Sequence, residues 1–480
     1  MRVLFILEPV TFSGAPGFLS AHFIWADMFR NWARATGVEF ALAANPTVCR
    51  LWQEKVAAEN TAETGATKVF PIEPFRVLSA HGYSRARYAK SLYTGEGGDD
   101  ISRQIAQIRA EFQPDMAVMT SQSLHIRKGL STPSAPPGTI QTKNSWWGAL
   151  AERAVNTLGK LRRSRRDRPA SHQCESHPTL PIVSIEQAPL PRLGHAVRTM
   201  LDPGGHQVGS ILETHAAQIR SLPLSPEQLA QASRLLRGLQ RYASRARPEA
   251  QVAQEALRRL GGDGEKIALL TTQPTDWVTY EGAHQQIEME NLLYCWADQL
   301  PDGWIGVPTY HLGQRLSPDM ENELARSHPR LRFLPPAYSQ GMTEALLPAA
   351  DGLVTISSTT AMTSLLFGKS TIVTGRSPFN AWCASQPGQI GTTPRLPEDQ
   401  AARLLAFLTN RVIECNSDLN ADPKHLSAFV ENVLMRPDAK PKRADAEWLF
   451  DMAGWSAKHA LRLFAAEAAQ DYEEAGKATP

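Results

Sequence analysis

The sequence has few cysteines, no long uncharged apolar run and almost no excess of charge, and each absence excludes a class of protein. The 50 lysines and arginines against 48 aspartates and glutamates leave a net charge of +2. That is too little for a nucleic-acid binder that relies on a positive field over its whole surface. No window reaches the ~18 uncharged apolar residues that a membrane-spanning helix needs. A zinc site and a disulfide framework are disfavoured because no Cys-x-x-Cys pair occurs among the five separated cysteines, Cys49, Cys174, Cys295, Cys383 and Cys415.

The composition is that of an ordinary soluble globular protein. Of the 480 residues, 42% are hydrophobic and 20% are charged, and the mean hydropathy is −0.30. These values exclude a disordered, collagenous or coiled-coil chain, and the length predicts two or three domains. The opening run MRVLFILEPV ends at Pro9 without a small-residue cleavage site, which favours a buried strand over a signal peptide. We therefore expect a cytoplasmic protein in a reducing compartment.

The standard catalytic motifs are absent as well. The chain has no Walker A sequence, no GxGxxG, no HExxH and no GxSxG. P-loop hydrolysis, dinucleotide redox chemistry, zincin proteolysis and the α/β-hydrolase mechanism therefore lose their usual support. No DxD follows a strand to hold a divalent metal. The expectation is chemistry without a metal or another cofactor.

Apolar runs and helical periodicities alternate along the first part of the chain, a pattern that predicts a parallel sheet covered by helices. Three prolines, a Trp146-Trp147 pair and six Lys/Arg within residues 160–168 interrupt this pattern, so residues 131–181 are predicted to be an insertion. The expected strands span residues 3–7, 38–43, 115–120 and 181–186. The expected helices span residues 19–35 and 101–112.

A second α/β series follows a helical segment. Ser225, Pro226 and Gln228 supply a capping serine, a proline at the first helical position and a glutamine three residues after the cap. The helical segment runs, with breaks, to about residue 260. The series beyond it has expected strands at 266–272, 303–308, 331–334, 352–357 and 370–374, and expected helices at 285–299, from Ser317-Pro318, at 343–349 and at 359–367.

The sequence therefore predicts an α/β fold of two Rossmann-like domains facing a cleft, with C-terminal helices that pack back over the first domain. Ligands of open α/β sheets bind outside the carboxyl ends of the strands, so such a cleft is where a ligand is expected. The expected parts are a first domain at 1–222, a helical connector at 223–262, a second domain at 263–425 and C-terminal helices at 426–480.

Four consecutive hydroxyl residues form the strongest local signal for a site. Ser357, Ser358, Thr359 and Thr360 follow a buried strand and precede a helix. Backbone N–H groups and hydroxyls at the start of a helix form an anion site. Helix capping is the simpler explanation, but one hydroxyl is enough to cap a helix. The cluster therefore favours phosphate binding.

The region of this cluster resembles the second-domain signature of the bacterial capsular polysaccharide biosynthesis glycosyltransferases, the group that includes the Kdo transferases of capsule assembly. The similarity starts at Asp351 and continues through the Leu-Leu-Phe-Gly-Lys-Ser run to Gly375. It covers about residues 180–380 and depends on the order and spacing of the motifs. The other matching positions are Glu186-Gln187 and Asp202 with Pro203-Gly204-Gly205 in the acidic first-domain motif, Gln273-Pro274 in a Gln-Pro pair, and His311-Leu312 where the group has His-Pro.

The resemblance implies a GT-B arrangement, with 1–222 as the acceptor-side domain and 263–425 as the nucleotide-sugar-binding domain, and transfer of a sugar from a nucleotide donor to a surface polysaccharide or glycolipid. Because no DxD is present, this transfer is expected to be metal-independent. Kdo from CMP-Kdo is one candidate donor. A departing phosphate needs charge stabilisation, which His311 and the four hydroxyls would provide beside Gln273. The acceptor needs a carboxylate base or the sugar a carboxylate nucleophile, and Glu186 and Asp202 are the candidates. The simpler roles are a strand-end group for Glu186, a turn for Asp202 and a structural histidine at 311.

Two alternative functions use the same fold. One is a nucleotide-sugar epimerase or hydrolase, and the other is a non-catalytic GT-B-like assembly subunit. Within the insertion, apolar residues recur at helical spacing before the basic run. Residues 146–168 therefore predict peripheral contact with the cytoplasmic face of the inner membrane, with a solvated loop as the alternative. No aromatic platform accompanies the charge, so no nucleic-acid partner is expected.

Overall fold

The structure, a computed structural model, describes most of the chain. The predicted insertion, apart from its ends, and all of the basic segment 146–168 lie outside the described residues. The described ranges are 1–7, 16–59, 68–73, 91, 99–120, 123–131, 180–192, 197–205, 209–262, 264–274, 288–312, 314–434, 446–464 and 466–477.

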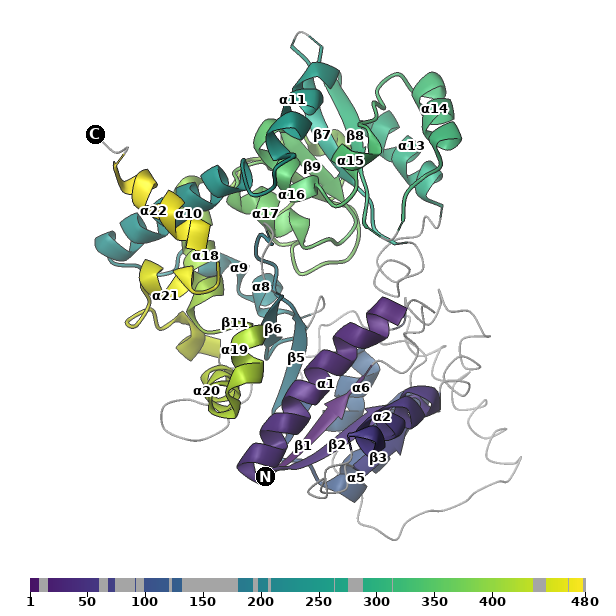
Figure 1. Cartoon of the computed structure of the whole chain (residues 1–480), viewed down its shortest axis with the longest axis vertical. Coiled ribbons are helices and arrows are strands. Elements are labelled where there is room, and N and C mark those ends of the chain that lie inside the picture. The colour runs from purple at the N-terminus through teal and green to yellow at the C-terminus, as the bar shows by residue number, and fades with distance from the viewer. Residues whose placement is uncertain are drawn as a thin grey trace, which may run out of the picture.

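A seven-stranded sheet forms the first domain (Figure 1), in the order β3-β2-β1-β4-β5-β6-β11. The strands β1 to β5 are parallel, β6 is antiparallel to β5, and β11 is antiparallel to β6. The order 3-2-1-4-5-6 is that of a Rossmann domain. The strands are β1 (Arg2–Ile6), β2 (Glu39–Ala44), β3 (Lys68–Pro71), β4 (Met116–Met119), β5 (Ile182–Gln187), β6 (Arg198–Asp202) and β11 (Ile413–Cys415).

Helices cover both faces of this sheet because its central strands are apolar on both sides. In β1, Val3 and Phe5 lie in the core shared with α1 and α2, whereas Leu4 and Ile6 lie in the core shared with α5 and α6. A strand buried on both faces appears in sequence as a continuous apolar run. The helices are α1 (Pro16–Thr36), α2 (Pro46–Ala58), α5 (Asp99–Phe112) and α6 (Leu124–Ser131).

A parallel four-stranded sheet forms the second domain, in the order β10-β9-β7-β8. Numbered within the domain this is the doubly wound order 2-1-3-4, in which the connections reverse direction between β7 and β9. The two sheets confirm the predicted α/β fold of two Rossmann-like domains. The strands are β7 (Lys266–Thr271), β8 (Trp304–Thr309), β9 (Gly352–Thr355) and β10 (Ser370–Val373).

The predicted strand at 331–334 is wrong. Leu331 forms only an isolated bridge to Gly306, and the chain then enters α15 (Pro336–Ser339). Two consecutive prolines, Pro335 and Pro336, have no N–H to donate to a sheet, so the pairing cannot continue. The other helices of the domain are α13 (Met289–Gln299), α14 (Pro318–Ser327), α16 (Thr343–Leu346) with the 3-10 turn η2 (Leu347–Ala349), α17 (Thr360–Leu366) and the 3-10 turn η3 (Pro387–Gln389).

Helices connect the two domains where the sequence predicts them. The chain leaves the first sheet through α8 (Ile211–Thr214) and α9 (Ala216–Arg220) and continues in α10 (Pro226–Ala243) and α11 (Ala250–Leu260). The predicted capping box at the start of α10 is present, since Ser225 accepts from the Gln228 N–H while the Gln228 side chain accepts from the Ser225 N–H.

The chain returns to the first domain earlier than residue 425, the predicted boundary. After α18 (Glu398–Asn410), β11 joins the first sheet by pairing with β6, and α19 (Asn416–Ala421) and α20 (Pro423–Leu434) follow. Phe429 of α20 lies in the same core as α1, and Trp32 of α1 donates to Ser427. The expected packing of C-terminal helices over the first domain is thereby confirmed for α20. The strand of three residues that starts this return is too short to stand out in the sequence.

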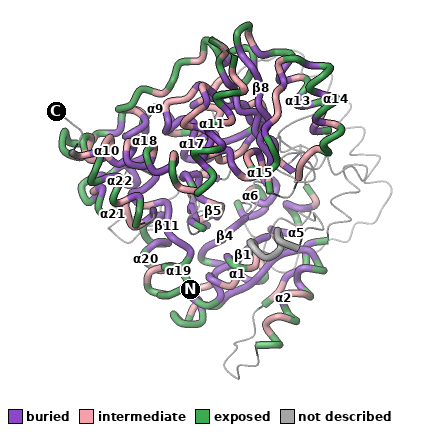
Figure 2. The backbone as a smooth tube through the Cα atoms, turned by 45° about the horizontal axis from the view of Figure 1, so that its top comes forward, coloured by how far each residue is buried: buried purple, intermediate pink, exposed green. Residues whose placement is uncertain are grey.

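The last helices pack on the connector. The 3-10 turn η4 (Ala446–Phe450) leads to α21 (Ala457–Leu461) and to α22 (Ala466–Lys477), which lies along α10 (Figure 1). A buried Asp471 pairs with Arg245 at 2.8 Å and fixes this packing. Burial follows the sheets, as the buried colour along β4, β5 and β8 shows in Figure 2.

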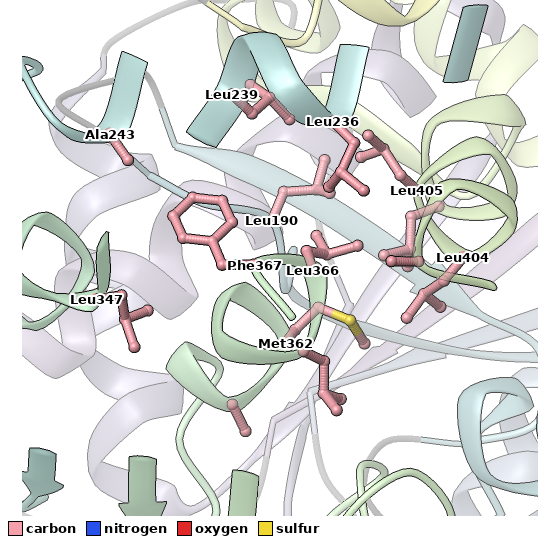
Figure 3. Close-up of a cluster of buried hydrophobic side chains, with 14 of the residues drawn as sticks. Leu190, Leu236, Leu239, Ala243, Leu347, Met362, Leu366, Phe367, Leu404 and Leu405 are labelled. Carbon is pink, nitrogen blue, oxygen red and sulfur yellow. The ribbon is translucent and has the colours of Figure 1, made fainter. Parts of the chain in front are cut away.

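One hydrophobic cluster joins elements of both domains. Leu190, which follows β5 of the first domain, lies between side chains of α10, α17 and α18 (Figure 3). Its neighbours there include Leu236 of the connector, Leu366 of the second domain and Leu405 of α18. Because Leu190 is only 2% exposed, this contact fixes the segment after β5 against the second domain.

Candidate active site

The second sheet brings most of the predicted donor-binding residues to one edge. Since β7, β8 and β9 are parallel neighbours, their carboxyl ends lie together. Gln273 follows β7, His311 follows β8, and the four hydroxyl residues follow β9. The point between β7 and β9 is also where the winding of the sheet reverses, which is where ligands of open α/β sheets bind.

Gln273 and Ser357 are hydrogen bonded to each other across that point. The backbone N–H of Ser357 donates to Oε1 of Gln273 at 2.9 Å. The Gln273 Nε2 lies 3.4 Å from the Ser357 hydroxyl. The glutamine therefore fixes the first residue of the hydroxyl cluster, although the two residues are 84 positions apart in the sequence.

Hydrogen bonds of buried threonine hydroxyls connect the strand ends at this edge. Thr309 at the end of β8 shares hydrogen bonds with Thr271 of β7 at 3.0 Å and with Thr343 of α16 at 2.8 Å. The Thr355 hydroxyl of β9 donates to the Thr271 carbonyl at 3.2 Å. These threonines could not be selected from the sequence, because each occupies a position in an apolar strand or a short helix. Their bonds hold the ends of three strands in fixed register.

The hydroxyls at 358–360 form the first turn of α17. Ser358 Oγ accepts from both the N–H and the hydroxyl of Thr360, at 3.3 and 3.0 Å, whereas Thr359 makes no side-chain cap. Within the described part of the chain, the N–H groups of Ser358 and Thr359 have no hydrogen-bond partner. The turn therefore presents unused N–H donors beside half-buried hydroxyls. Since α17 has only seven residues, these local donors matter more than its dipole.

His311 lies just past the end of β8, in a turn held by backbone and side-chain bonds. The Tyr310 N–H donates to the Ser339 carbonyl, and the Gln340 side chain donates to the Leu312 carbonyl at 2.7 Å. The imidazole is half-buried. Burial lowers the pKa of His311 below its usual 6.5, and the positive charge of Arg192 lowers it further. The imidazole is therefore neutral near pH 7 and can donate a hydrogen bond from one ring nitrogen.

Glu186 lies near the carboxyl end of β5, as predicted. Its side chain is half-buried, and its Oε1 accepts from the Gln187 N–H at 2.9 Å. The neighbouring strand β6 places Met200 opposite Glu186, and β4 lies on the other side of β5. The carboxylate thus occupies the ligand-binding edge of the first sheet. Its role as base or nucleophile remains a prediction.

Asp202 is placed differently from Glu186. Because β6 runs antiparallel to β5, Asp202 is opposite Ser184, two residues or ~7 Å back from Glu186 along the strand. Its carboxylate accepts hydrogen bonds from four groups: the N–H groups of Gly204 at 2.8 Å, Gly205 at 3.1 Å and Ile211 at 3.1 Å, and the hydroxyl of Ser210 at 2.6 Å.

These bonds give Asp202 a structural role in the turn after β6 and at the start of α8. Burial raises the pKa of Asp202, and the hydrogen bonds from Ser210, Gly204 and Gly205 oppose that rise. The simpler expectation, a turn aspartate, is therefore what the contacts show. The sequence did not predict β6 as a strand, so it could not show that Asp202 lies further back from the strand-end edge than Glu186. A catalytic role for Asp202 remains an untested prediction.

The helix that Asp202 supports docks on the second domain. Trp382, in the segment after β10, donates from its ring N–H to the Leu212 carbonyl of α8 at 2.7 Å. Arg376 pairs with Glu213 of the same helix at 2.7 Å. The Asp202 network therefore connects the first sheet to a contact between the domains.

A second contact between the domains centres on Arg192. Its backbone N–H donates to Glu344 Oε2 of α16 at 2.9 Å, and the other oxygen of Glu344 accepts from Thr363 of α17 at 3.0 Å. The Arg192 guanidinium donates to the Gln187 side-chain oxygen at 2.6 Å. Arg192 could not be selected from the sequence, since Pro-Arg-Leu-Gly has the pattern of an ordinary loop.

The described residues contain no group of three or more histidine, cysteine, aspartate or glutamate residues that could hold a metal ion. None of their helices combines the length and the hydrophobicity that crossing a bilayer requires.

Comparisons with known proteins find only distant similarity. No protein-family model and no curated protein matches the chain. The structure of Thermosulfurimonas dismutans KpsC, a beta Kdo 2,7 transferase, is 15% identical over 58% of this chain and 89% of that one, with a TM-score of 0.30. Anabaena Alr3699/HepE, in complex with UDP and glucose, is 10% identical over 90% and 99%, with a TM-score of 0.32. The UDP-GlcNAc 2-epimerase from Neisseria meningitidis is 10% identical over 99% and 100%, with a TM-score of 0.28. At such scores the function has to be argued from the site.

Proposed function

We propose that this protein is a GT-B-type glycosyltransferase that moves a sugar from a nucleotide donor to a glycan or glycolipid acceptor. The observation that supports it most is the meeting of Gln273, His311 and the hydroxyl cluster at the switch point of the second sheet. Hydroxyls, unused backbone N–H groups and a neutral imidazole are donors of hydrogen bonds, and phosphate oxygens are acceptors.

The donor phosphate binds to this edge in the proposed mechanism. The N–H groups of Ser358 and Thr359 and the hydroxyl of Ser357 donate to phosphate oxygens, while Gln273 fixes Ser357. His311 donates to the oxygen that carries the departing charge. Donors that are already oriented cost no reorganisation as that charge develops, so they stabilise the transition state more than the bound donor.

Glu186 acts on the acceptor side. If the sugar is transferred with inversion, its carboxylate takes the proton of the acceptor hydroxyl. If transfer retains configuration, the carboxylate attacks the anomeric carbon, the bond to the donor phosphate breaks and the nucleotide leaves. The acceptor oxygen then displaces the carboxylate from the enzyme-linked sugar, and the released carboxylate takes up the acceptor proton. Both roles need an ionised carboxylate, and Glu186 is half-buried at the strand edge and accepts a backbone N–H.

The finer specificity we propose is Kdo from CMP-Kdo, delivered to a surface polysaccharide or glycolipid at the cytoplasmic face of the inner membrane. Its support is the ordered set of motifs between residues 180 and 380, together with the basic segment 146–168, which lies outside the described residues. We also propose that the reaction needs no metal, since His311 and the hydroxyl cluster supply charge stabilisation.

One assay separates this function from its alternatives. The purified protein is incubated with a panel of nucleotide sugars that includes CMP-Kdo, with and without acceptor glycans, and with and without EDTA. Acceptor-dependent release of nucleotide supports the transferase. Acceptor-independent conversion of the donor would instead show an epimerase or hydrolase, and no turnover of any donor would favour an assembly subunit. Loss of activity in EDTA that magnesium or manganese restores would overturn the metal-independent mechanism.

A further inference from the structure

Arg192 combines a rigidly held backbone with an exposed side chain. Leu190, two residues earlier, is buried between the domains (Figure 3), and the carbonyl of Pro191 accepts from the buried guanidinium of Arg198 at 2.5 Å. The N–H of Arg192 itself donates to Glu344 at 2.9 Å. Three consecutive residues are thus fixed, while the Arg192 side chain remains exposed.

The contacts of Glu344 place Arg192 beside the donor edge. The residue before Glu344, Thr343, donates to Thr309 at the end of β8, two residues before His311. The second oxygen of Glu344 accepts from Thr363 in α17, the helix that begins with the hydroxyl cluster. Arg192 therefore lies close to two of the three elements that form the proposed phosphate site.

The guanidinium of Arg192 has N–H donors that no described residue uses. It carries five N–H donors, and among the described residues its side chain has one hydrogen-bond acceptor, the neutral amide oxygen of Gln187. No carboxylate of the described chain forms an ion pair with it. By contrast Arg245 and Arg315 both pair with a carboxylate, at 2.8 and 2.7 Å.

The positive charge of Arg192 also lowers the pKa of two neighbouring groups. It lowers the pKa of His311, after the larger effect of burial. Together with burial it lowers the pKa of Arg198, which is about 10. Glu186 and Glu344 are the acidic groups near this position, and one oxygen of each accepts a backbone N–H, from Gln187 and from Arg192. An anion bound to the Arg192 guanidinium would relieve its repulsion of His311 and Arg198.

We propose that Arg192 is a donor-binding residue of the first domain, which contacts the phosphate of a nucleoside mono- or diphosphate held at the edge of the second sheet. This inference rests on the proposed function. The guanidinium leaves the Gln187 oxygen and donates two parallel hydrogen bonds to phosphate oxygens, the geometry that arginine provides and lysine does not. Donor binding is then shared between the two domains.

The test measures binding of CMP, UDP and inorganic pyrophosphate by calorimetry to the full chain and to three variants. Arg192→Gln removes the charge, Arg192→Lys keeps the charge but not the paired donors, and both leave the backbone bond to Glu344 in place. Arg259→Gln is the matched control, because Arg259 is exposed on α11 and contacts only Glu255 among the described residues. Thermal unfolding of each variant checks that it is folded.

We expect Arg192→Gln to weaken nucleotide binding about tenfold or more, Arg192→Lys to weaken it less, and Arg259→Gln to leave it unchanged. Equal nucleotide affinity of the wild type and a folded Arg192→Gln variant would overturn the role of Arg192 and leave the proposed function standing. If the protein binds pyrophosphate in an Arg192-dependent manner but binds no nucleotide, the anion site is supported and the proposed nucleotide donor is overturned. If the wild-type protein binds none of the three ligands, both the role of Arg192 and the proposed function are overturned.

Discussion

Oε1 of Gln273 lies 2.9 Å from the backbone nitrogen of Ser357 and accepts its hydrogen, across the boundary between β7 and β9. The bond satisfies a backbone donor at the very turn where the hydroxyl cluster begins. The next N–H groups, those of Ser358 and Thr359, have no hydrogen-bond partner within the described part of the chain. The glutamine acts on the proposed phosphate site by fixing this turn.

Replacing Gln273 should separate its positioning role from its effect on charge. Gln273→Ala removes the acceptor of the Ser357 N–H, which should lower the free energy of unfolding by about 1–2 kcal/mol and weaken nucleotide binding. Gln273→Glu keeps that acceptor but brings a negative charge to the phosphate site. We therefore expect Gln273→Glu to be the more stable variant in urea unfolding and the weaker binder in calorimetry. The opposite order of affinities would mean that the phosphate does not bind near Gln273.

The regular parts of the fold could be predicted because parallel strands buried on both faces are apolar throughout. The runs at 3–7 and 266–272 correspond to β1 and β7 for that reason. The strand β6 could not, since Arg198, Thr199 and Asp202 give it a polar sequence. Arg198 and Thr199 are buried against distant partners, the Leu463 carbonyl and Asn416, whereas Asp202 is buried in the turn that follows the strand.

The residues of the candidate site also divide into those that could be predicted from the sequence and those that could not. Gln273, His311 and the hydroxyl residues follow predicted strands directly, so the rule for ligands at strand ends was enough to group them. Arg192 follows no such pattern, because its position depends on Glu344, which lies 152 residues further along the chain. Residues that only tertiary contacts bring to a site leave little local signal in one sequence.

The ionisation of His311 offers a test that does not depend on turnover. Because its folded-state pKa lies below 6.5, the neutral imidazole stabilises the fold above pH 6.5, and that contribution is lost as the pH falls through the folded pKa. The difference in unfolding free energy between the wild type and His311→Asn should shrink between pH 7 and pH 5. An NMR titration of the ring protons should also show a higher midpoint when nucleotide is added, since a phosphate stabilises the imidazolium. A midpoint that nucleotide does not move would place the phosphate away from His311.

Asp202→Asn should reduce stability more than chemistry. The asparagine keeps one acceptor for Gly204 and Gly205 but places an NH₂ group against the N–H of Ile211. The Ile211 N–H then keeps only its longer bond, at 3.3 Å to the other oxygen, so we expect the free energy of unfolding in urea to fall by about 1–3 kcal/mol. Turnover by the folded fraction should stay within about threefold of the wild type. A loss of turnover near ~10²-fold with unchanged stability would assign the catalytic carboxylate to Asp202.

The proposed membrane contact depends on the basic segment 146–168, which lies outside the described residues. Clustered lysines and arginines contribute on the order of 1 kcal/mol each near anionic lipid. Deleting 146–168 should therefore reduce binding to anionic liposomes in a sedimentation assay and leave turnover on a soluble acceptor near normal. Neutral liposomes are the control. Equal binding of both proteins to anionic liposomes would support the solvated-loop alternative.

Glu186→Gln tests the catalytic assignment most directly. Glutamine keeps the size of the side chain and an oxygen that can accept from the Gln187 N–H, so the local structure should be retained. The variant loses only the charge. If Glu186 is the base or the nucleophile, its contribution appears in the transition state and not in the bound donor. We therefore expect turnover to fall by ~10²-fold or more, while nucleotide affinity and unfolding free energy stay close to those of the wild type.

Glu344→Gln is a useful comparison, because Glu344 lies at the domain contact and should affect nucleotide affinity more than turnover at saturating donor. Turnover near normal in Glu186→Gln, with nucleotide still bound, would leave Glu186 as a strand-end group and overturn its catalytic role.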